Sequence, residues 1–282
     1  MKVYTTIASL QEALKIEHSE GLKVGFVPTM GALHEGHLSL VKKAGEMCDV
    51  VVVSIFVNPT QFNDKNDLAN YPRTLETDLN LLSSVRCEYV FSPSDKEVYP
   101  TADTRNFGFG TLESVMEGEF RPGHFNGVAQ VVSRLFEIVQ PDKAFFGRKD
   151  FQQLAIITEL VKQMNYPVEI VPCEIIRESD GLAMSSRNKL LLPEHRRCAG
   201  IIYQTLREAS ILAGTKSVSE IKEYVISGIN STQLLRTEYF EIVNEITLFP
   251  VQNWSEPGIK VGCIAVFAGK VRLIDNMILN SI

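Results

Sequence analysis

Two apolar runs near the start of the chain constrain its fold most strongly. Residues 22–27 and 50–57 are largely apolar and rich in β-branched side chains, as is typical of strands buried on both faces of a parallel sheet. Between them, Leu38, Val41 and Ala44 recur at the spacing of one helix face. A strand, a helix and a strand in this order predict a βαβ unit, because parallel neighbours need a crossover connection.

The same alternation continues through the first half of the chain. The predicted segments are a helix at 75–82, a strand at 88–91, a helix at 128–139, a strand at 143–146, a helix through 154–164 and a strand at 168–171. Strands and helices that alternate at these lengths favour the α/β class. We therefore expect a doubly wound, Rossmann-like parallel sheet over residues 1–175.

The pattern changes after residue 175. Helices are predicted at 193–212 and 218–226, followed by strands near Tyr239, Val261 and Val271. Turn sequences separate each of these strands from the next, which favours antiparallel pairing. We expect residues 176–282 to form a second, smaller α+β domain that acts as a lid.

Composition excludes several classes of protein. The formal net charge is −6, and the basic residues are not clustered as they are in proteins that bind nucleic acid. The apolar runs are too short to span a membrane. The five cysteines are scattered without CxxC spacing, which argues against a disulfide framework or a zinc knuckle. We expect a cytoplasmic protein without nucleic-acid or membrane partners.

The strongest local signal lies at 28–38, where the first apolar strand ends and a helix begins. His34 and His37 flank Glu-Gly in this segment, and Gly31 and Gly36 allow close approach of the backbone to a ligand. A helix N-terminus adds positive potential. This arrangement indicates a phosphate site. Two unrelated loop histidines, or two zinc ligands, remain the alternatives, although no neighbouring set of ligands completes a tetrahedral site.

A second segment, Met184-Ser185-Ser186-Arg187, follows the polar turn at 177–181. Two hydroxyl groups and a guanidinium group are suitable donors to phosphate oxygens, because arginine offers a planar fork. An exposed loop with a serine at a helix start is the alternative interpretation. The segment becomes informative when it is paired with the two histidines.

A third segment, residues 147–153, again joins a predicted strand to a helix. Lys149 there can reach phosphate, Asp150 can accept from ribose hydroxyl groups, and Gln153 can face an acyl substrate. A solvated lysine and a helix-capping Asp150 are the plainer alternative. The chain has no GxxxxGK[ST] sequence, which excludes a P-loop nucleotide site.

The HxGH and MSSR segments resemble the HIGH and KMSKS signatures of the nucleotidylyltransferase superfamily. With the other motifs, the chain resembles the pantothenate synthetase (pantoate-beta-alanine ligase) family over nearly its whole length. The motifs that carry this resemblance are PTMGALHEGH (28–37), SIFVNPTQF (54–62), YPRT (71–74), RPGHFNGV (121–128), GRKDFQQL (147–154) and DGLAMSSRN (180–188).

The resemblance implies an ATP-dependent ligase of pantothenate biosynthesis. Pantoate and ATP would give pantoyl-adenylate and pyrophosphate, and the amine of beta-alanine would then displace AMP to form pantothenate. The family also implies Mg²⁺ and a homodimer. The alternatives are another nucleotidylyltransferase, which leaves the nucleotide on its product, and a non-enzymatic nucleotide sensor that kept the fold.

The resemblance also assigns roles to individual residues. The residues assigned to ATP are Met30, Gly31, Ala32, Leu33, His34, Glu35, Gly36, His37, Gly147, Arg148, Lys149, Asp150, Ile176, Met184, Ser185, Ser186 and Arg187. The catalytic residues among them are His34, His37, Lys149, Ser185, Ser186 and Arg187.

The remaining assignments concern the other substrates and the metal. Gln61 and Gln153 are expected to bind pantoate, and Gln61 also to bind beta-alanine. Asp78 matches a carboxylate associated with Mg²⁺, but Thr77 stands where some members carry an acidic residue. We expect the metal to arrive with ATP, because Mg²⁺ prefers a few carboxylates together with phosphates and water. Further positions that match the family near the pocket are Asn58, Tyr71, Arg121 and His124.

Overall fold

The computed structural model describes residues 1–63 and 65–280. Within these residues the chain forms two compact units. Unit 1 comprises Met1–Phe109, Phe120–Arg148 and Gln153–Glu174, and unit 2 comprises Gly110–Glu119, Lys149–Gln152 and Ile175–Ile282. The long stretch of unit 2 begins next to the boundary expected from the sequence. The two short segments that join it were not anticipated, because they come from the middle of the α/β pattern.

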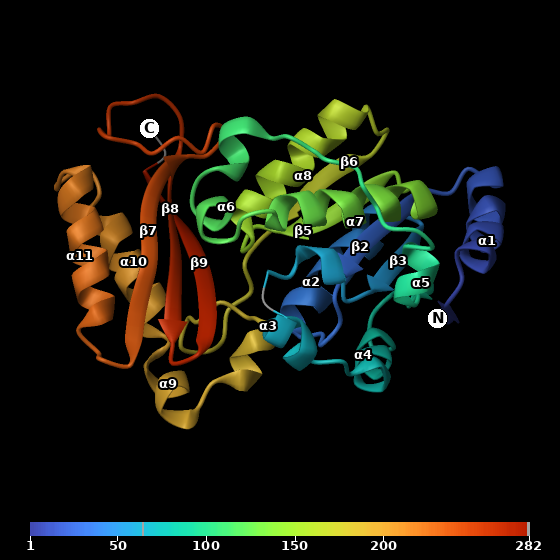
Figure 1. Ribbon diagram of the computed structural model, residues 1–282, viewed down its shortest axis with the longest axis horizontal. Coiled ribbons are helices and arrows are strands. Elements are labelled where there is room, and N and C mark those ends of the chain that lie inside the picture. The colour runs from blue at the N-terminus through green and yellow to red at the C-terminus, as the bar shows by residue number, and fades with distance from the viewer. Residues whose placement is uncertain (64, 281–282) are drawn as a thin grey trace. The chain divides into compact units, whose positions relative to one another are not determined.

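The sheet of unit 1 is parallel throughout, with strand order β1-β4-β3-β2-β5-β6. Its strands are β1 (Lys2–Tyr4), β2 (Val24–Thr29), β3 (Val50–Ile55), β4 (Tyr89–Phe91), β5 (Lys143–Gly147) and β6 (Glu169–Cys173). All of them except the short edge strand β1 were predicted. Apart from the edge strand β1, chain order runs outward from β2 in both directions, so the doubly wound sheet is confirmed (Figure 1).

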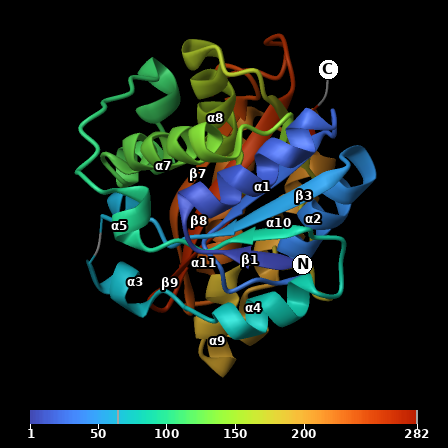
Figure 2. The same ribbon diagram turned by 90° about the vertical axis from the view of Figure 1, so that its right-hand side faces the viewer.

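Helices flank this sheet (Figures 1 and 2). The main ones are α1 (Ile7–Ser19), α2 (Glu35–Met47), α4 (Leu75–Leu82), α7 (His124–Val139) and α8 (Phe151–Met164), and the shorter ones are α3 (Lys65–Asn70) and α5 (Asp95–Val98). Val41 of α2 and Leu82 of α4 share a core with Val27 of β2. The neighbouring residue Phe26 instead packs edge-on against Phe136 of α7. Because adjacent strand residues point to opposite faces, α2 and α7 cover opposite sides of the sheet.

The strand order places β2 beside both β3 and β5. The chain turns from β2 toward β3 first, and later returns to add β5 on the other side, so the order reverses between β2 and β5. In open α/β sheets, ligands bind outside the carboxyl ends of the strands at such a reversal. The segments at this position are 30–37, which follows β2, and 148–150, which follows β5.

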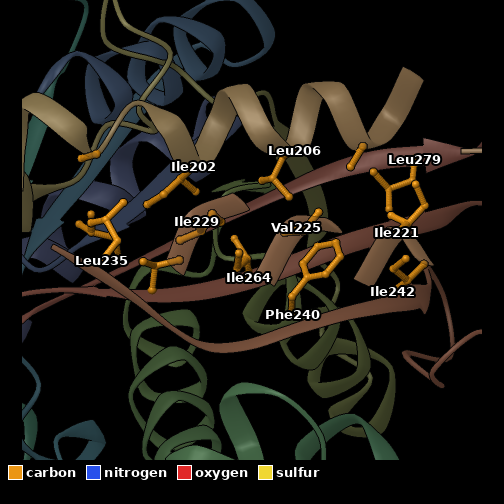
Figure 3. Close-up of a cluster of buried hydrophobic side chains, with 14 of the residues drawn as sticks. Ile202, Leu206, Ile221, Val225, Ile229, Leu235, Phe240, Ile242, Ile264 and Leu279 are labelled. Carbon is orange, nitrogen blue, oxygen red and sulfur yellow. The ribbon is translucent and has the colours of Figure 1, made fainter. Parts of the chain in front are cut away.

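Unit 2 is built on an antiparallel sheet of β7 (Leu235–Asn244), β8 (Lys260–Ala268) and β9 (Val271–Asn280). It also contains the helices α9 (Pro193–Cys198), α10 (Ile201–Leu212) and α11 (Val218–Asn230), and all of α6 (Glu117–Phe120) except its last residue. Side chains of α10, α11 and the sheet, among them Leu206, Val225 and Phe240, form one buried cluster (Figure 3). The expected α+β class is confirmed.

The single helix predicted at 193–212 is wrong in one respect. It is divided into α9 and α10 at Ala199 and Gly200. Gly200 lies against the turn at Asp180, because a Cβ atom built on it would stand 3.0 Å from the Asp180 carbonyl oxygen. This tertiary contact has no counterpart in the helical pattern of the sequence.

Two further expectations concern the chain as a whole. None of the helices in the described residues is long and apolar enough to cross a membrane. All five cysteines lie within the described residues and are free, in agreement with the expectation that the chain has no disulfide framework.

Candidate active site

A buried carboxylate holds the loop that follows β2. The backbone N–H groups of Ala32 and Leu33 donate to Asp78 Oδ2 and Oδ1 at 2.9 Å and 2.8 Å. Gly31 has φ +78° and Ala32 has φ +50°, a left-handed conformation that is uncommon for alanine. Thr29 Oγ1 accepts from the Gly31 N–H at 3.2 Å. The loop is thus fixed in an unusual conformation by main-chain hydrogen bonds.

These contacts give Asp78 a role that the sequence analysis did not anticipate. Its side chain is only 1% exposed, and Oδ1 also accepts from Thr74 Oγ1 at 3.2 Å. Both carboxylate oxygens are therefore engaged within the protein. Among residues 1–63 and 65–280, no group of three or more His, Cys, Asp or Glu side chains is arranged to hold a metal ion. The Mg²⁺ role of Asp78 stays a prediction.

The two histidines of the HxGH segment cap the N-terminus of α2. His34 Nδ1 accepts from the Gly36 N–H at 3.1 Å, and His37 Nδ1 accepts from the His34 N–H at 3.3 Å. Their ring centroids lie 4.1 Å apart. A ring nitrogen that accepts a backbone N–H carries no proton, so each neutral imidazole holds its proton on Nε2. The helix start therefore offers two Nε2–H donors together with its positive dipole end.

Three predicted pocket residues of unit 1 lie around a fourth, Gln61. Gln61 is 9% exposed, and its Oε1 accepts from Asn58 Nδ2 at 3.1 Å. Its Nε2 lies 3.4 Å from the sulfur of Met30. The Gln61 carbonyl oxygen lies 2.9 Å from His124 Nδ1. Tyr71, which matched the family by sequence, is buried. The structure thus brings Met30, Asn58, Gln61 and His124 together.

The residues after β5 have separate surroundings. Arg148 Nε pairs with Glu174 at 3.2 Å in unit 1. Lys149 Nζ lies 3.4 Å from Asp150 Oδ1 in unit 2, and the Lys149 carbonyl oxygen accepts from Asn276 Nδ2 at 3.0 Å. The sequence analysis missed Asn276. A signal was present, because Asp275 and Asn276 interrupt an otherwise largely apolar strand.

A buried ion pair holds the base of the segment that contains Met184–Arg187. Arg177 NH1 and NH2 donate to the Asp275 carboxylate at 2.6 Å and 3.0 Å. Burial raises the pKa of Asp275, while the Arg177 guanidinium acts to lower it. Arg177 also forms an isolated bridge with Ala183. The Met184 N–H donates to the Ile176 carbonyl at 2.9 Å, which places these two predicted nucleotide contacts side by side.

Ser185, Ser186 and Arg187 stand at the start of a short 3-10 helix, Ser186–Leu190. Ser185 Oγ accepts from the Arg187 N–H at 3.3 Å, and Ser186 is buried. The plainer interpretation of a serine at a helix start therefore holds for Ser185. It does not exclude a later contact with phosphate, because a hydroxyl group can donate and accept at once.

The two neighbouring glutamines after β5 have different surroundings. Gln152 is buried, and its Nε2 donates to the carbonyls of Leu112 and Val115 at 2.8 Å each. It therefore fixes the segment Gly110–Glu119 within unit 2. Gln153, the predicted pantoate contact, is half-buried in the first turn of α8. Arg121 is half-buried and follows α6.

Comparison with known proteins gives a consistent result. The model of the family "Pantoate-beta-alanine ligase" matches residues 2–278. A pantothenate synthetase from Bacteroides fragilis is 56% identical, with 98% of both chains covered. One from Porphyromonas gingivalis is 50% identical, with 98% of this chain and 99% of that one covered.

Solved structures resemble the chain over almost its full length. The crystal structure of pantothenate synthetase from Thermus thermophilus matches with a TM-score of 0.92 and 42% identity, covering 99% of both chains. Pantoate-beta-alanine ligase from Francisella tularensis, complexed with beta-gamma ATP and beta-alanine, matches with a TM-score of 0.83 and 36% identity. That match covers 99% of this chain and 98% of the other.

Proposed function

The chain belongs to the pantoate-beta-alanine ligase family, and from that premise we propose which of its residues carry out the reaction. It is an enzyme of pantothenate biosynthesis that uses ATP to join pantoate to beta-alanine. Two bonds have to be made, and the first of them joins a carboxylate to a triphosphate, two groups with charges of like sign.

In the first step, the pantoate carboxylate attacks the α-phosphorus of ATP and pyrophosphate leaves. In the second step, the amine of beta-alanine attacks the acyl carbon of pantoyl-adenylate and AMP leaves. The first step brings two anions together, so its main requirement is positioning and neutralisation of charge. A protein nucleophile is not required for either step.

The observation that carries this proposal is the reciprocal capping by His34 and His37. Because each Nδ1 accepts a backbone N–H, each imidazole has its Nε2–H as the donor to an anion. His37 is proposed to donate to the phosphate oxygens that gain charge as pyrophosphate leaves, with His34 beside it. The Asp78 carboxylate fixes the loop that leads into this helix start.

Further phosphate and nucleotide contacts are proposed from the other two motif segments. Lys149, Ser185, Ser186 and Arg187 are proposed to neutralise the phosphates, because an ammonium, hydroxyl groups and a guanidinium group suit phosphate oxygens. The proposed nucleotide contacts, apart from these and the histidines, are Met30, Gly31, Ala32, Leu33, Glu35, Gly36, Gly147, Arg148, Asp150, Ile176 and Met184.

Pantoate is proposed to lie against Gln61 and Gln153, and beta-alanine against Gln61. Carboxamide groups suit this substrate because they can donate to its carboxylate and accept from its hydroxyl groups. Met30, whose sulfur lies 3.4 Å from Gln61 Nε2, is proposed to pack on the apolar part of pantoate.

The metal does not fit a site built by the protein alone. Both oxygens of Asp78 accept hydrogen bonds from within the loop and α4, and Thr77 supplies no second carboxylate. We therefore propose that Mg²⁺ enters as a complex with ATP, held chiefly by phosphate oxygens and water. A cytoplasmic homodimer and a lid role for unit 2 are likewise proposals, which rest on the family.

The exchange of labelled pyrophosphate into ATP tests the proposed first step. With the purified full chain, exchange should require pantoate and proceed without beta-alanine, while AMP should accumulate only when all three substrates are present. Exchange without pantoate would contradict an acyl-adenylate route. A product that keeps the nucleotide would indicate another nucleotidylyltransferase.

A further inference from the structure

The side chain of Asn58 lies at the centre of a buried hydrogen-bond network in unit 1. It is 1% exposed, and it immediately precedes the short 3-10 helix Pro59–Gln61. Its Nδ2 lies 3.1 Å from both Gln61 Oε1 and the Gly127 carbonyl oxygen. Its Oδ1 lies 2.9 Å from the Tyr99 hydroxyl and 3.1 Å from Thr60 Oγ1.

Two partners identify which end of this amide is nitrogen and which is oxygen. The Gly127 carbonyl can only accept, so the Asn58 atom that faces it must be nitrogen. The Thr60 backbone N–H can only donate, and it points to the opposite atom, Oδ1, at 3.4 Å. The amide oxygen and nitrogen, which are hard to tell apart by shape, are thereby assigned by their neighbours.

The orientation of Asn58 then determines that of Gln61. The second N–H of Asn58 points to Gln61 and requires an acceptor there, so Oε1 of Gln61 faces Asn58. Nε2 of Gln61 is left on the side of Met30, whose thioether sulfur is a weak acceptor. A ligand oxygen can displace that sulfur at little cost. Gln61 is therefore set up to donate to a substrate.

Tyr99 closes this network from another part of the chain. It follows the helix α5, 41 residues from Asn58, and its ring packs against Phe56 with centroids 6.1 Å apart. Burial raises the pKa of Tyr99 to about 12, so its hydroxyl group keeps its proton at neutral pH. It makes the shortest of the contacts to Asn58 Oδ1.

We propose that Tyr99 is a positioning residue for pantoate: through Asn58, its hydroxyl group holds Gln61 with the amide nitrogen toward the substrate. This inference rests on the proposed role of Gln61 in binding pantoate. It adds a direction to that role, since Gln61 donates to an oxygen of pantoate rather than accepting from a hydroxyl group. Tyr99 itself touches no reacting atom.

The variant Tyr99→Phe tests the proposal, because it removes the hydroxyl group and leaves the ring on Phe56. Pantoate-dependent pyrophosphate exchange is measured with pantoate and with ATP varied in turn. We expect the KM for pantoate to rise about twofold to tenfold, the range of one hydrogen bond, while the KM for ATP stays within about twofold. A merely structural role would lower Tm without separating the two KM values.

Tyr89→Phe is the matched control. It removes a hydroxyl group that bonds to Glu17 elsewhere in unit 1, and neither KM should change. Asn58→Asp supplies the second arm, because it replaces the donor to Gln61 by an acceptor. Adding Tyr99→Phe to Asn58→Asp should raise the KM for pantoate no further, as expected for residues that act through the same series of hydrogen bonds.

Two results would overturn the positioning role of Tyr99 while leaving the enzyme function intact. One is normal exchange by the unmodified chain and an unchanged KM for pantoate in Tyr99→Phe. The other is an equal rise in the KM values for pantoate and ATP. If the unmodified chain shows no pantoate-dependent exchange, the proposed function fails instead, and the two failures are distinguishable.

Discussion

In each unit a buried aspartate holds a segment that was predicted to belong to the site, but the two aspartates do so in different ways. In unit 1, Asp78 accepts from the neutral backbone N–H groups of Ala32 and Leu33. In unit 2, Asp275 accepts from the Arg177 guanidinium through two hydrogen bonds. Their exposed fractions are similar, at 1% and 4%. The difference lies in the partner and not in the degree of burial.

This difference has a physical consequence. Main-chain donors are present whatever the side chains of residues 32 and 33 are, so Asp78 constrains the conformation of the loop directly. The Arg177–Asp275 pair instead depends on two side chains, each of which leaves an uncompensated charge when the other is removed. The first arrangement fixes the conformation of the loop after β2, and the second chiefly serves the integrity of unit 2.

The largest expected effect is on the ion pair. Arg177→Met should lower the free energy of unfolding of unit 2 by about 3–5 kcal/mol, because Asp275 is left buried without a counter-charge. The single tryptophan, Trp254, lies in unit 2, so urea unfolding followed by its fluorescence reports this unit. Arg177→Met with Asp275→Leu should recover most of the loss. If the single and double variants were equally stable, the unpaired Asp275 charge would not be the cause of the loss. The proposed difference between the two aspartates would then be refuted.

The next effect is on catalysis in unit 1. His37→Ala should lower kcat/KM for pyrophosphate exchange. The loss should correspond to a rise of about 2–4 kcal/mol in activation free energy, the scale of one donor to developing charge. His18→Ala, which changes a half-buried histidine in the last turn of α1, is the control and should have no effect. Near-normal exchange by the His37 variant would contradict its assignment.

Asp78→Asn should have a smaller effect. It should weaken the hydrogen bonds that hold the loop by about 1.5–3 kcal/mol, the contribution of a hydrogen bond to a charged group. Its amide nitrogen would face a backbone N–H, so the loop should shift and the KM for ATP should rise. The Mg²⁺ concentration for half-maximal activity should stay unchanged, and a large increase would favour the metal role instead. Asp142→Asn is the control, because Asp142 accepts from the Val24 N–H at the start of β2.

The smallest effect concerns the exposed pair at the turn beside Arg177. The Arg196 guanidinium lowers the pKa of Asp180 below 3.8, so the pair stabilises unit 2 above pH 3.8 and the contribution is lost as pH falls below that value. Both side chains are 34% exposed, and solvent screening limits the contribution to about 0.5 kcal/mol. Asp180→Asn should remove it at pH 7 and change little in strong acid, as measured by Trp254 fluorescence.

Asp275 should respond to pH in the opposite sense. Because burial raises its pKa above 3.8, the cost of charging it grows as pH rises through that value. Asp275 is present in both the unmodified chain and Asp180→Asn, so its titration cancels and the difference in their unfolding free energies should follow Asp180 alone. A pH dependence of that difference above neutrality would contradict this separation.

The sequence by itself determined the α/β class, the strands β2 to β6 and the positions of the segments to which we assign the chemistry. These follow from local patterns: apolar runs, one-sided helix faces, and the HxGH, GRKD and MSSR segments at strand or loop ends. Buried parallel strands are apolar at nearly every position whatever surrounds them. The end of β2 was therefore predictable from residues close to it along the chain.

Only the tertiary structure decided which side chains support those segments. Asp78 lies 46 residues from Ala32, Tyr99 lies 41 from Asn58, and Asn276 lies 127 from Lys149. It also assigned Gly110–Glu119 and Lys149–Gln152 to unit 2, against their place in the α/β pattern. A hydrogen bond needs two groups within about 3 Å, and that proximity arises from the packing of whole elements.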